Sequence, residues 1–453
     1  MALVQRPATG SAPSAATITG RRKRTLLCAG LAILALSAGA YVAVVARHPL
    51  SMMVTGFDLR VYRGAGLEVR HDPAGLYDWQ QAPGARFTYT PFAALLFVLP
   101  TVIAWPILLW LMLGVSLLAF VATVWMTFGQ LGWHGRRRLG VASALIGVAL
   151  WTEPVQRTLH LGQVELLLMA LIVWDLCQPG RRWWQGAGIG LAAGIKLVPL
   201  IFIPYLLLTR RPRQAAVAAG AFVVTSAIGW AALPASSAAW WSGDFVSASR
   251  TGFVGFQANQ SALGLLTRML SGSRIVTPLW LGLAAVVAVA GLIGAALLHL
   301  SGRTAHGWVT CALTGVLVSP ISWDHHWVWI VPLSAVLADT ALRARGGVRL
   351  AWWATLGLVL LAFGGYPSFW RSGAAFTPWG LIWYPPGTLV SSQPGSHPEY
   401  AWQGLQLVAG NLYVFAGAGL LAVMLGMAGR AWRPSDALLG LLPLRRHRLA
   451  APK

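Results

Sequence analysis

Asp58 lies in the stretch Thr55-Gly56-Phe57-Asp58-Leu59, shortly after the first long apolar segment. The chain has only 12 Asp and Glu among 453 residues, so a carboxylate at this place indicates a function. A carboxylate can take the proton from an attacking hydroxyl group as a general base. The spacing leaves a structural alternative open, in which Asp58 pairs with Arg60 or Arg63 or caps a helix.

Other polar residues recur in the connections between apolar segments, where they are functional hypotheses by default. The set comprises Arg60, Arg63, His160, Gln163, Glu165, Lys196, Asn259, Gln260, Trp323, Asp324, His325 and His326. With Asp58, it suits transfer of a group away from a phosphate leaving group. Asp58 would accept the proton, and Lys196, His325 and His326 would stabilise charge on the departing phosphate. We expect the remaining residues of the set to contact substrate, with Asn259 and Gln260 contacting a sugar.

Each of these residues also has a purely structural interpretation. Lys196 could extend its ammonium to a membrane surface, and Glu165 could pair with His160 or Arg157. His325 and His326 could form a packed turn. A metal site beside Asp324 is not predicted, because adjacent histidines project in different directions on a helix. The sequence contains neither a Walker A loop nor a Rossmann fingerprint, so we expect no cofactor and no nucleotide-linked donor.

Composition places most of the protein surface in lipid. Hydrophobic residues make up 57% of the chain and charged residues 10%, against about 25% charged in soluble proteins. The net charge of +22 does not indicate nucleic-acid binding, because the basic residues form short clusters between apolar runs. This is the positive-inside pattern of a multi-pass membrane protein. It predicts a plasma-membrane protein with both termini in the cytoplasm and the polar connections on the outer face.

The apolar runs predict an all-α polytopic fold with about 12 transmembrane helices, short broken pairs included. Full-length spans are expected at 25–46, 105–128, 214–233, 276–300, 350–366 and 404–428. Three pairs of shorter runs are expected at 141–151 with 163–178, 186–195 with 197–208, and 308–319 with 327–342. Short helices whose polar ends converge can enclose a cavity open to one face. The predicted organisation is a cytoplasmic tail 1–24, one transmembrane domain 25–428 with outer loops 47–91, 234–275 and 367–403, and a basic tail 429–453.

Several short motifs, in order along the chain, carry a resemblance to a known family. They are Phe57-Asp58-Leu59-Arg60-Val61-Tyr62, Gly75-Leu76-Tyr77-Asp78, Phe87-Thr88-Tyr89-Thr90-Pro91-Phe92, Gly162-Gln163-Val164-Glu165-Leu166-Leu167, Ala193-Gly194-Ile195-Lys196-Leu197-Val198-Pro199, Asn259-Gln260-Ser261 and Ser319-Pro320-Ile321-Ser322-Trp323-Asp324-His325-His326-Trp327. The chain resembles the GT-C superfamily of polyprenyl-phosphate-sugar-dependent membrane glycosyltransferases. More narrowly, it is similar to an actinobacterial family of α-1,2-mannosyltransferases and an arabinofuranosyltransferase.

This resemblance implies a specific reaction. Asp58 falls on the family's general base, and the family implies inversion, from a β-linked polyprenyl-phosphate-mannose donor to an α-1,2-linked product. The implied acceptor is a glycolipid of the outer leaflet, with acylated phosphatidylinositol tetramannoside favoured. Lipomannan mannosylation and arabinan branching from decaprenyl-phosphate-arabinose stay open as alternatives. A lipid or sugar transporter is the non-enzyme alternative, although the chain shows no internal repeat of the kind that transporters often have.

Overall fold

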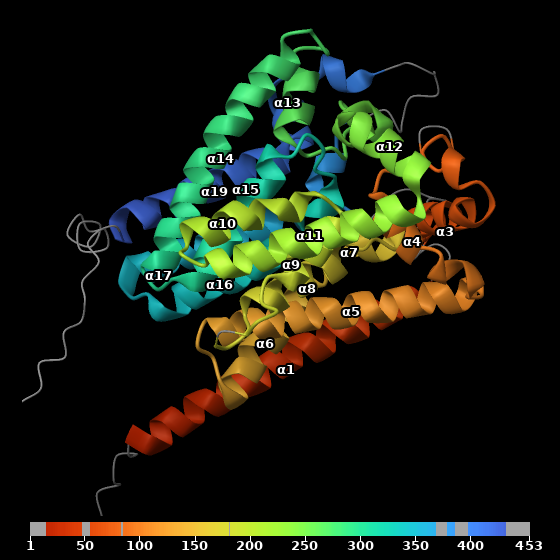
Figure 1. Cartoon of the computed structure of the whole chain (residues 1–453). Coiled ribbons are helices and arrows are strands. Elements are labelled where there is room, and N and C mark those ends of the chain that lie inside the picture. Colours follow the sequence, from red (N-terminus) through yellow and green to blue (C-terminus); the bar gives the residue numbers. More distant parts are fainter. Residues whose placement is uncertain are drawn as a thin grey trace, which may run out of the picture.

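The computed structural model describes residues 15–47, 55–82, 85–180, 182–367, 378–385 and 397–431, and these residues are almost entirely helical (Figure 1). The α-helices are α1 (Ala15–Arg47), α3 (Phe57–His71), α4 (Pro91–Leu96), α5 (Trp105–Gln130), α6 (Gly135–Ala149), α7 (Glu153–Leu161), α8 (Glu165–Leu176), α9 (Ala187–Ile195), α10 (Phe202–Leu208), α11 (Pro212–Ala232), α12 (Pro234–Ser242), α13 (Ala262–Met269), α14 (Val276–Leu300), α15 (Thr304–Val318), α16 (Ile330–Arg343), α17 (Gly346–Ala362), α18 (Gly404–Gly410) and α19 (Leu412–Ala431). Short 3₁₀ helices are η1 (Pro73–Gly75), η2 (Leu99–Val102), η3 (Val198–Ile201), η4 (Asp244–Val246), η5 (Ala248–Thr251), η6 (Asp324–Trp329), η7 (Leu381–Trp383) and η9 (Pro398–Ala401). Two strands of two residues, β1 (Tyr366–Pro367) and β2 (Pro378–Trp379), pair antiparallel.

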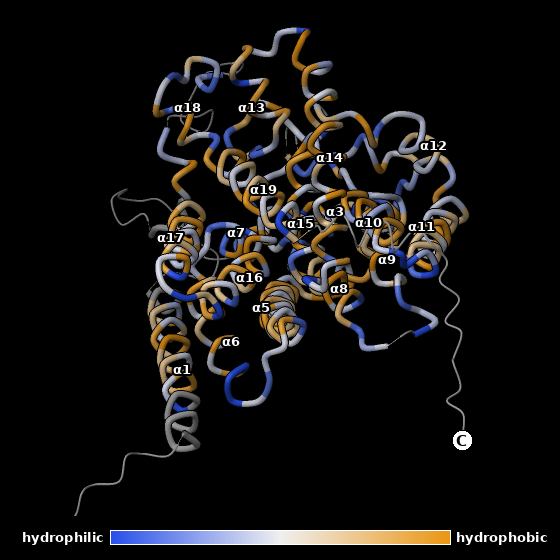
Figure 2. The backbone as a smooth tube through the Cα atoms, turned by 90° about the vertical axis from the view of Figure 1, so that its left-hand side faces the viewer, coloured by the Kyte–Doolittle hydropathy of each residue, from blue (hydrophilic) through white to orange (hydrophobic). Residues whose placement is uncertain are grey.

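Long apolar helices identify a membrane protein. In the described part of the chain, α1, α5, α11, α14 and α19 are long and apolar enough to cross a bilayer, and the bent pair α7–α8 makes a sixth candidate. Four further apolar segments are shorter, at 91–102, 198–208, 304–318 and 346–362. Figure 2 shows hydrophobic residues along these helices and hydrophilic stretches in connections such as the one from α5 to α6. The predicted span 404–428 is divided at Asn411 into α18 and α19.

Close helix packing depends on glycine. Helices α1, α5 and α6 lie side by side along the lower edge of Figure 1. A Cβ atom on Gly30 of α1 would lie 1.9 Å from the carbonyl oxygen of Gly140 on α6, so the two backbones touch. The same happens between α9 and α11, where a Cβ on Gly190 would lie 2.2 Å from the carbonyl oxygen of Ala218. Small residues allow this approach in membrane helices. The second contact sets the position of Lys196, the residue that follows α9.

The first short pair differs from its prediction. The connection between the runs expected at 141–151 and 163–178 is itself helical: it contains α7, with Pro154 in its first turn, where proline is tolerated. The helix ends at Gly162, whose φ of 69° favours glycine. Helices α7 and α8 meet at 116°. This sharp bend directs Gln163 and Glu165 to the centre of the protein.

The two other short pairs break where the sequence predicts. Helix α9 ends at Ile195, so Lys196 lies between α9 and η3 with extended backbone. Helices α15 and α16 are joined by residues 319–329, which include η6 and both histidines. The segments 47–91 and 234–275, predicted to be outer loops, contain α3 and α12–α13. Most of loop 367–403, residues 1–14 of the first tail and residues 432–453 of the second lie outside the described residues.

Candidate functional site

A cavity of about 730 Å³ lies where the broken helices converge. Its wall includes the start of α3, residues 85–90, the α7–α8 turn, Lys196, residues 240–258 and the connection 319–326. Seven of the predicted site residues line it. They are Asp58, Gln163, Lys196, Trp323, Asp324, His325 and His326.

Asp58 lies in the first turn of α3, which is held against the end of α7. The backbone N–H of Gly56 donates to the carbonyl oxygen of His160 at 3.0 Å. The Asp58 carboxylate accepts a hydrogen bond of 2.6 Å from Nε2 of Gln163. The structural alternatives for Asp58 are not found in the described residues: α3 has Gly56 at its N-cap with no side-chain cap hydrogen bond, and the guanidinium of Arg60 lies over the ring of Trp105. Likewise, Arg63 donates to backbone carbonyls, including that of Thr101.

The surroundings of Asp58 favour a basic carboxylate. Burial raises the pKa of the Asp58 carboxyl above its ordinary value, and the charge of Glu165 adds to that rise. His325, the Gln163 hydrogen bond and Arg157 act in the opposite direction without cancelling it. A base whose pKa lies nearer the working pH is a more effective proton acceptor. Asp58 therefore combines access to the cavity with the electrostatics of a general base.

Gln163 connects Asp58 to two buried tyrosines. Its Oε1 accepts from the hydroxyl of Tyr89 at 3.0 Å and also from the hydroxyl of Tyr62. The two hydroxyl oxygens are themselves 2.8 Å apart. Because both tyrosine hydroxyls lie at Oε1, the side-chain amide points its Nε2 at Asp58. Asp58 thus accepts a hydrogen bond from an amide whose orientation the two tyrosines fix.

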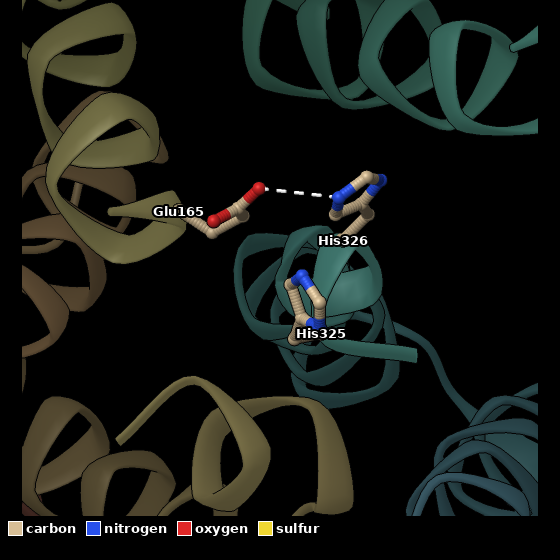
Figure 3. A group of neighbouring side chains, drawn as sticks. All are labelled: Glu165, His325 and His326. Atoms are coloured by element: carbon tan, nitrogen blue, oxygen red, sulfur yellow. Dashed lines mark ion pairs between the residues drawn. The ribbon is translucent and has the colours of Figure 1, made fainter. Parts of the chain in front are cut away.

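Lys196 lies at the centre of a second polar group. Its ammonium forms an ion pair with Glu165, donates to Nε2 of His326 at 2.8 Å and reaches the Tyr89 hydroxyl at 3.4 Å. Figure 3 shows Glu165 from α8 and His326 from η6 facing each other, with 3.3 Å between Glu165 Oε1 and His326 Nε2. Burial and the Lys196 charge lower the pKa of His326 well below its ordinary value, so this imidazole is neutral. The structural alternative for Glu165, a pairing with His160 or Arg157, is wrong, because Glu165 pairs with Lys196.

The third polar group orients His325. Asp324 accepts from the backbone N–H of His325 at 2.7 Å and lies 3.1 Å from its Nδ1. The other oxygen of Asp324 forms an ion pair of 3.3 Å with Arg157. Although burial opposes ionisation, Arg157 and His325 hold the pKa of Asp324 below its ordinary value. Nε2 of His325 is buried and has no hydrogen-bond partner among the described residues.

The remaining predicted residues do not line this cavity. Asn259 accepts from the backbone N–H of Ser322 at 3.0 Å, and its amide donates to Val254. Gln260 donates to the carbonyl of Gly410 at 2.7 Å. These two side chains are buried and hydrogen-bond to backbone groups behind the cavity wall, and their predicted contact with a sugar stays a prediction. His160 is buried, and its carbonyl holds the start of α3.

Sequence reasoning missed several residues at the site. Tyr62, Tyr89 and Arg157 line the cavity and contact its polar residues, and residues 244–253 with Arg250 form one wall. Tyr62 and Tyr89 fall inside motifs that the sequence already singles out. The tyrosine hydroxyls inside these motifs were therefore the available signal, whereas the wall at 244–253 contains no motif of this kind.

A narrow apolar crevice opens beside Lys196 and His326. Its other walls are mostly apolar, with Leu168, Met169, Ile172, Phe202, Val316 and Trp329 among them. Glu165, Lys196 and His326 form the polar side of this crevice, and the same three residues make up the polar group around Lys196 described above. Lys196 and His326 line both this crevice and the large cavity, so these two side chains lie where the two spaces meet.

Glu165, His325 and His326 place their possible ligand atoms within 4.8 Å of one another. A cation site is conceivable from these residue types. However, the Lys196 ammonium already contacts Glu165 and His326, so one positive charge of the protein occupies the centre of the group. The donor set suits an anion held by Lys196 better than a metal ion.

Comparison with known proteins agrees with this geometry. Glycosyltransferase family 87 matches residues 87–320, about half of the chain. A Mycobacterium tuberculosis protein is 33% identical over 390 residues, covering 83% of this chain and 88% of the relative; it is named polyprenol-phosphate-mannose-dependent alpha-(1-2)-phosphatidylinositol pentamannoside mannosyltransferase. A Mycolicibacterium smegmatis protein of the same name is 32% identical, covering 72% and 80%.

A second M. tuberculosis protein is 31% identical and covers 67% of this chain and 72% of its own length. It is named polyprenol-phosphate-mannose-dependent alpha-(1-2)-phosphatidylinositol mannoside mannosyltransferase. No solved structure matches the chain. The extent of these matches, which include the α7–α8 turn, Lys196 and Asn259, shows that the chain belongs to glycosyltransferase family 87.

Proposed function

We propose that this protein transfers mannose from polyprenyl-phosphate-mannose to a phosphatidylinositol mannoside and forms an α-1,2 linkage. The observation that carries the proposal is one cavity that joins a carboxylate base to a cationic phosphate position. The names of the relatives support the donor and the class of acceptor.

The two cavities suit the two parts of the donor. Its phosphate binds Lys196, with His325 and His326 beside it. The isoprenoid chain starts directly at that phosphate and enters the apolar crevice lined by Leu168 and Phe202. The mannose lies in the large cavity on the side of Asp58.

Asp58 acts as the general base. It takes the proton of the acceptor hydroxyl while that oxygen attacks the anomeric carbon, and the bond from this carbon to the phosphate oxygen breaks. The electron pair of that bond stays on the lipid phosphate, whose charge Lys196 stabilises. Attack opposite the phosphate inverts a β-linked mannose to an α-linked product. We propose that Lys196 provides the positive charge for this step and that no metal or cofactor takes part.

The acceptor glycan contacts the wall at 240–253. Aromatic side chains of Trp240, Phe245 and Phe253 line the cavity there, beside Arg250. Aromatic faces pack against sugar rings, and Arg250 is already held by an ion pair of 3.0 Å with Asp244. We propose acylated phosphatidylinositol tetramannoside as the acceptor, and the aromatic side chains of this wall support a glycan-binding role.

We also propose a membrane orientation with the cavity on the outer face of the plasma membrane. The basic clusters would face the cytoplasm, as would the tails 1–24 and 429–453. A single transmembrane domain, 25–428, would cross the bilayer about 12 times, with the shorter helices completing crossings near the cavity. Accessibility of a cysteine introduced into residues 244–253 to an impermeant reagent tests this orientation.

The function is tested with purified protein in nanodiscs, synthetic polyprenyl-phosphate-mannose and phosphatidylinositol mannoside acceptors. Products are read by mass spectrometry. We expect one added hexose, lost in Asp58→Asn. Glu68→Gln is the matched control, because it also removes a carboxylate from α3 but lies outside the cavity.

Other outcomes point elsewhere. A pentose added only from decaprenyl-phosphate-arabinose would assign the arabinosyl reaction instead. No product with either donor, from protein that binds the donor, would favour a transporter. Full activity of Asp58→Asn would refute the role of Asp58.

A further inference from the structure

Lys196 has no N–H left for a substrate in this structure. An ammonium group has three donors. All three are directed at protein acceptors, namely Glu165, His326 at 2.8 Å and Tyr89 at 3.4 Å. A phosphate oxygen can therefore accept a full hydrogen bond from Lys196 only if one of these partners moves away.

Glu165 is the partner that must leave. It is the anionic member of the three, so it and a phosphate would place two negative charges on one ammonium. Its Oε2 is buried and has no hydrogen-bond partner among the described residues. Nε2 of His326 accepts from Lys196 and thus has no proton to offer Glu165. Tyr89, in contrast, is neutral and is anchored by Gln163 and Tyr62.

We propose that Glu165 is an exchangeable counter-ion of Lys196. Glu165 moves away when the donor phosphate binds the Lys196 ammonium. After transfer it pairs with Lys196 again and displaces the lipid phosphate product. This inference rests on the proposed function and adds a means of product release to it. Glu165 is a positioning residue in this scheme, since it acts on substrate through Lys196.

The charge balance of the reaction explains why such a residue is useful. The donor is a phosphodiester with one negative charge. Transfer breaks the bond between the anomeric carbon and the phosphate oxygen, the acceptor proton goes to Asp58, and the lipid phosphate becomes a monoester. A phosphate monoester carries about −1.5 to −2 at neutral pH. Lys196 would consequently bind product more tightly than donor unless a nearby anion competes, and Glu165 is that anion.

The experiment compares the wild-type chain with Glu165→Gln, Glu165→Asp and the control Glu68→Gln. It measures KM for polyprenyl-phosphate-mannose and the inhibition constant for polyprenyl phosphate. In Glu165→Gln we expect the ratio of the inhibition constant to KM to fall about tenfold or more, because the product gains more than the donor from loss of a nearby unit charge. Glu165→Asp keeps the charge, so its ratio stays near that of the wild type.

An unchanged ratio in Glu165→Gln, or a weaker binding of polyprenyl phosphate, would overturn the proposal. If the wild-type chain transfers no mannose, the proposed function fails by itself. Direct binding of polyprenyl phosphate then decides the inference: tighter binding by Glu165→Gln than by wild type supports it, and equal or weaker binding overturns it.

A measurement on the wild-type chain covers the case in which Glu165→Gln does not fold. The sequence contains only four glutamates, so ¹³C-labelled glutamate gives few carboxylate bands in an infrared difference spectrum. Addition of polyprenyl phosphate should shift one glutamate carboxylate band as Glu165 leaves Lys196. A spectrum without such a shift at saturating polyprenyl phosphate would overturn the proposal.

Discussion

Replacement of Gln163 by methionine tests how the base is held. The substitution keeps the length of the side chain but removes the 2.6 Å donor to Asp58 and the acceptor for two tyrosine hydroxyls. Tyr62 and Tyr89 still have each other at 2.8 Å, so the loss falls mainly on Asp58. A hydrogen bond to a charged group is worth about 1.5–3 kcal/mol.

We expect kcat/KM of Gln163→Met to fall about 10- to 150-fold, because Asp58 is no longer held in position and a smaller fraction of it is ionised; this range corresponds to the free energy of the lost hydrogen bond. The sign of the pH effect also follows. The Gln163 hydrogen bond lowers the pKa of Asp58, so its removal raises that pKa further. Because the base must be ionised to act, the acidic limb of the pH–rate profile should move to higher pH.

The assay is mannose transfer in nanodiscs at a series of pH values. Gln156→Met is the matched control, since Gln156 is equally buried, lies on α7 and donates to the carbonyl of Leu150 outside the cavity. A rate loss in Gln163→Met without any shift of the acidic limb would refute the reasoning that Gln163 acts through Asp58. A normal rate would refute the whole network.

Three further predictions concern the stability of the fold, donor binding in the apolar crevice, and the source of the positive charge in the transfer step. Arg268 is buried and donates to Asn411 and three backbone carbonyls, so Arg268→Ala should cost about 3–5 kcal/mol and lower the Tm in detergent, whereas exposed Arg274→Ala should not. In Gly315→Val the new side chain meets Ile201 in the crevice, because a Cβ atom on residue 315 would lie 3.2 Å from the Ile201 side chain. This variant should raise the KM for the donor about tenfold and leave the KM for the acceptor unchanged. Gly282→Val is the control, because a Cβ atom there has no neighbour within 4 Å. Treatment with EDTA should leave the transfer rate unchanged; a loss restored by one divalent ion would contradict the assignment of positive charge to Lys196.

Much of the membrane architecture could be predicted from local sequence. Five of the helices expected as full spans are long and apolar in the structure, because twenty apolar residues in succession have few other stable arrangements. The breaks at Lys196 and at 319–329 were also predictable, since polar residues interrupt the apolar runs there. The α7 helix was not, because its residues are polar and its helical state depends on burial between neighbouring helices.

Candidate residues of the site were likewise visible in the sequence, but their partners were not. Asp58, Lys196 and the two histidines stand out as rare polar residues beside apolar segments. Asn259 and Gln260 stand out in the same way, although both hydrogen-bond to backbone groups behind the cavity wall. Composition and spacing cannot tell a side chain that faces a cavity from one that satisfies backbone groups next to it.

The sequence by itself determined a helical membrane protein, the place of its polar connections and a short list of residues suited to phosphate-leaving-group chemistry. These properties follow from hydrophobicity and charge, which act locally along the chain. Only the tertiary structure decided that Asp58 is held by Gln163 and that Lys196 is shared among Glu165, His326 and Tyr89. These partners lie from 31 to 130 positions apart in the chain, and glycine-mediated helix contacts and the sharp α7–α8 bend bring them together.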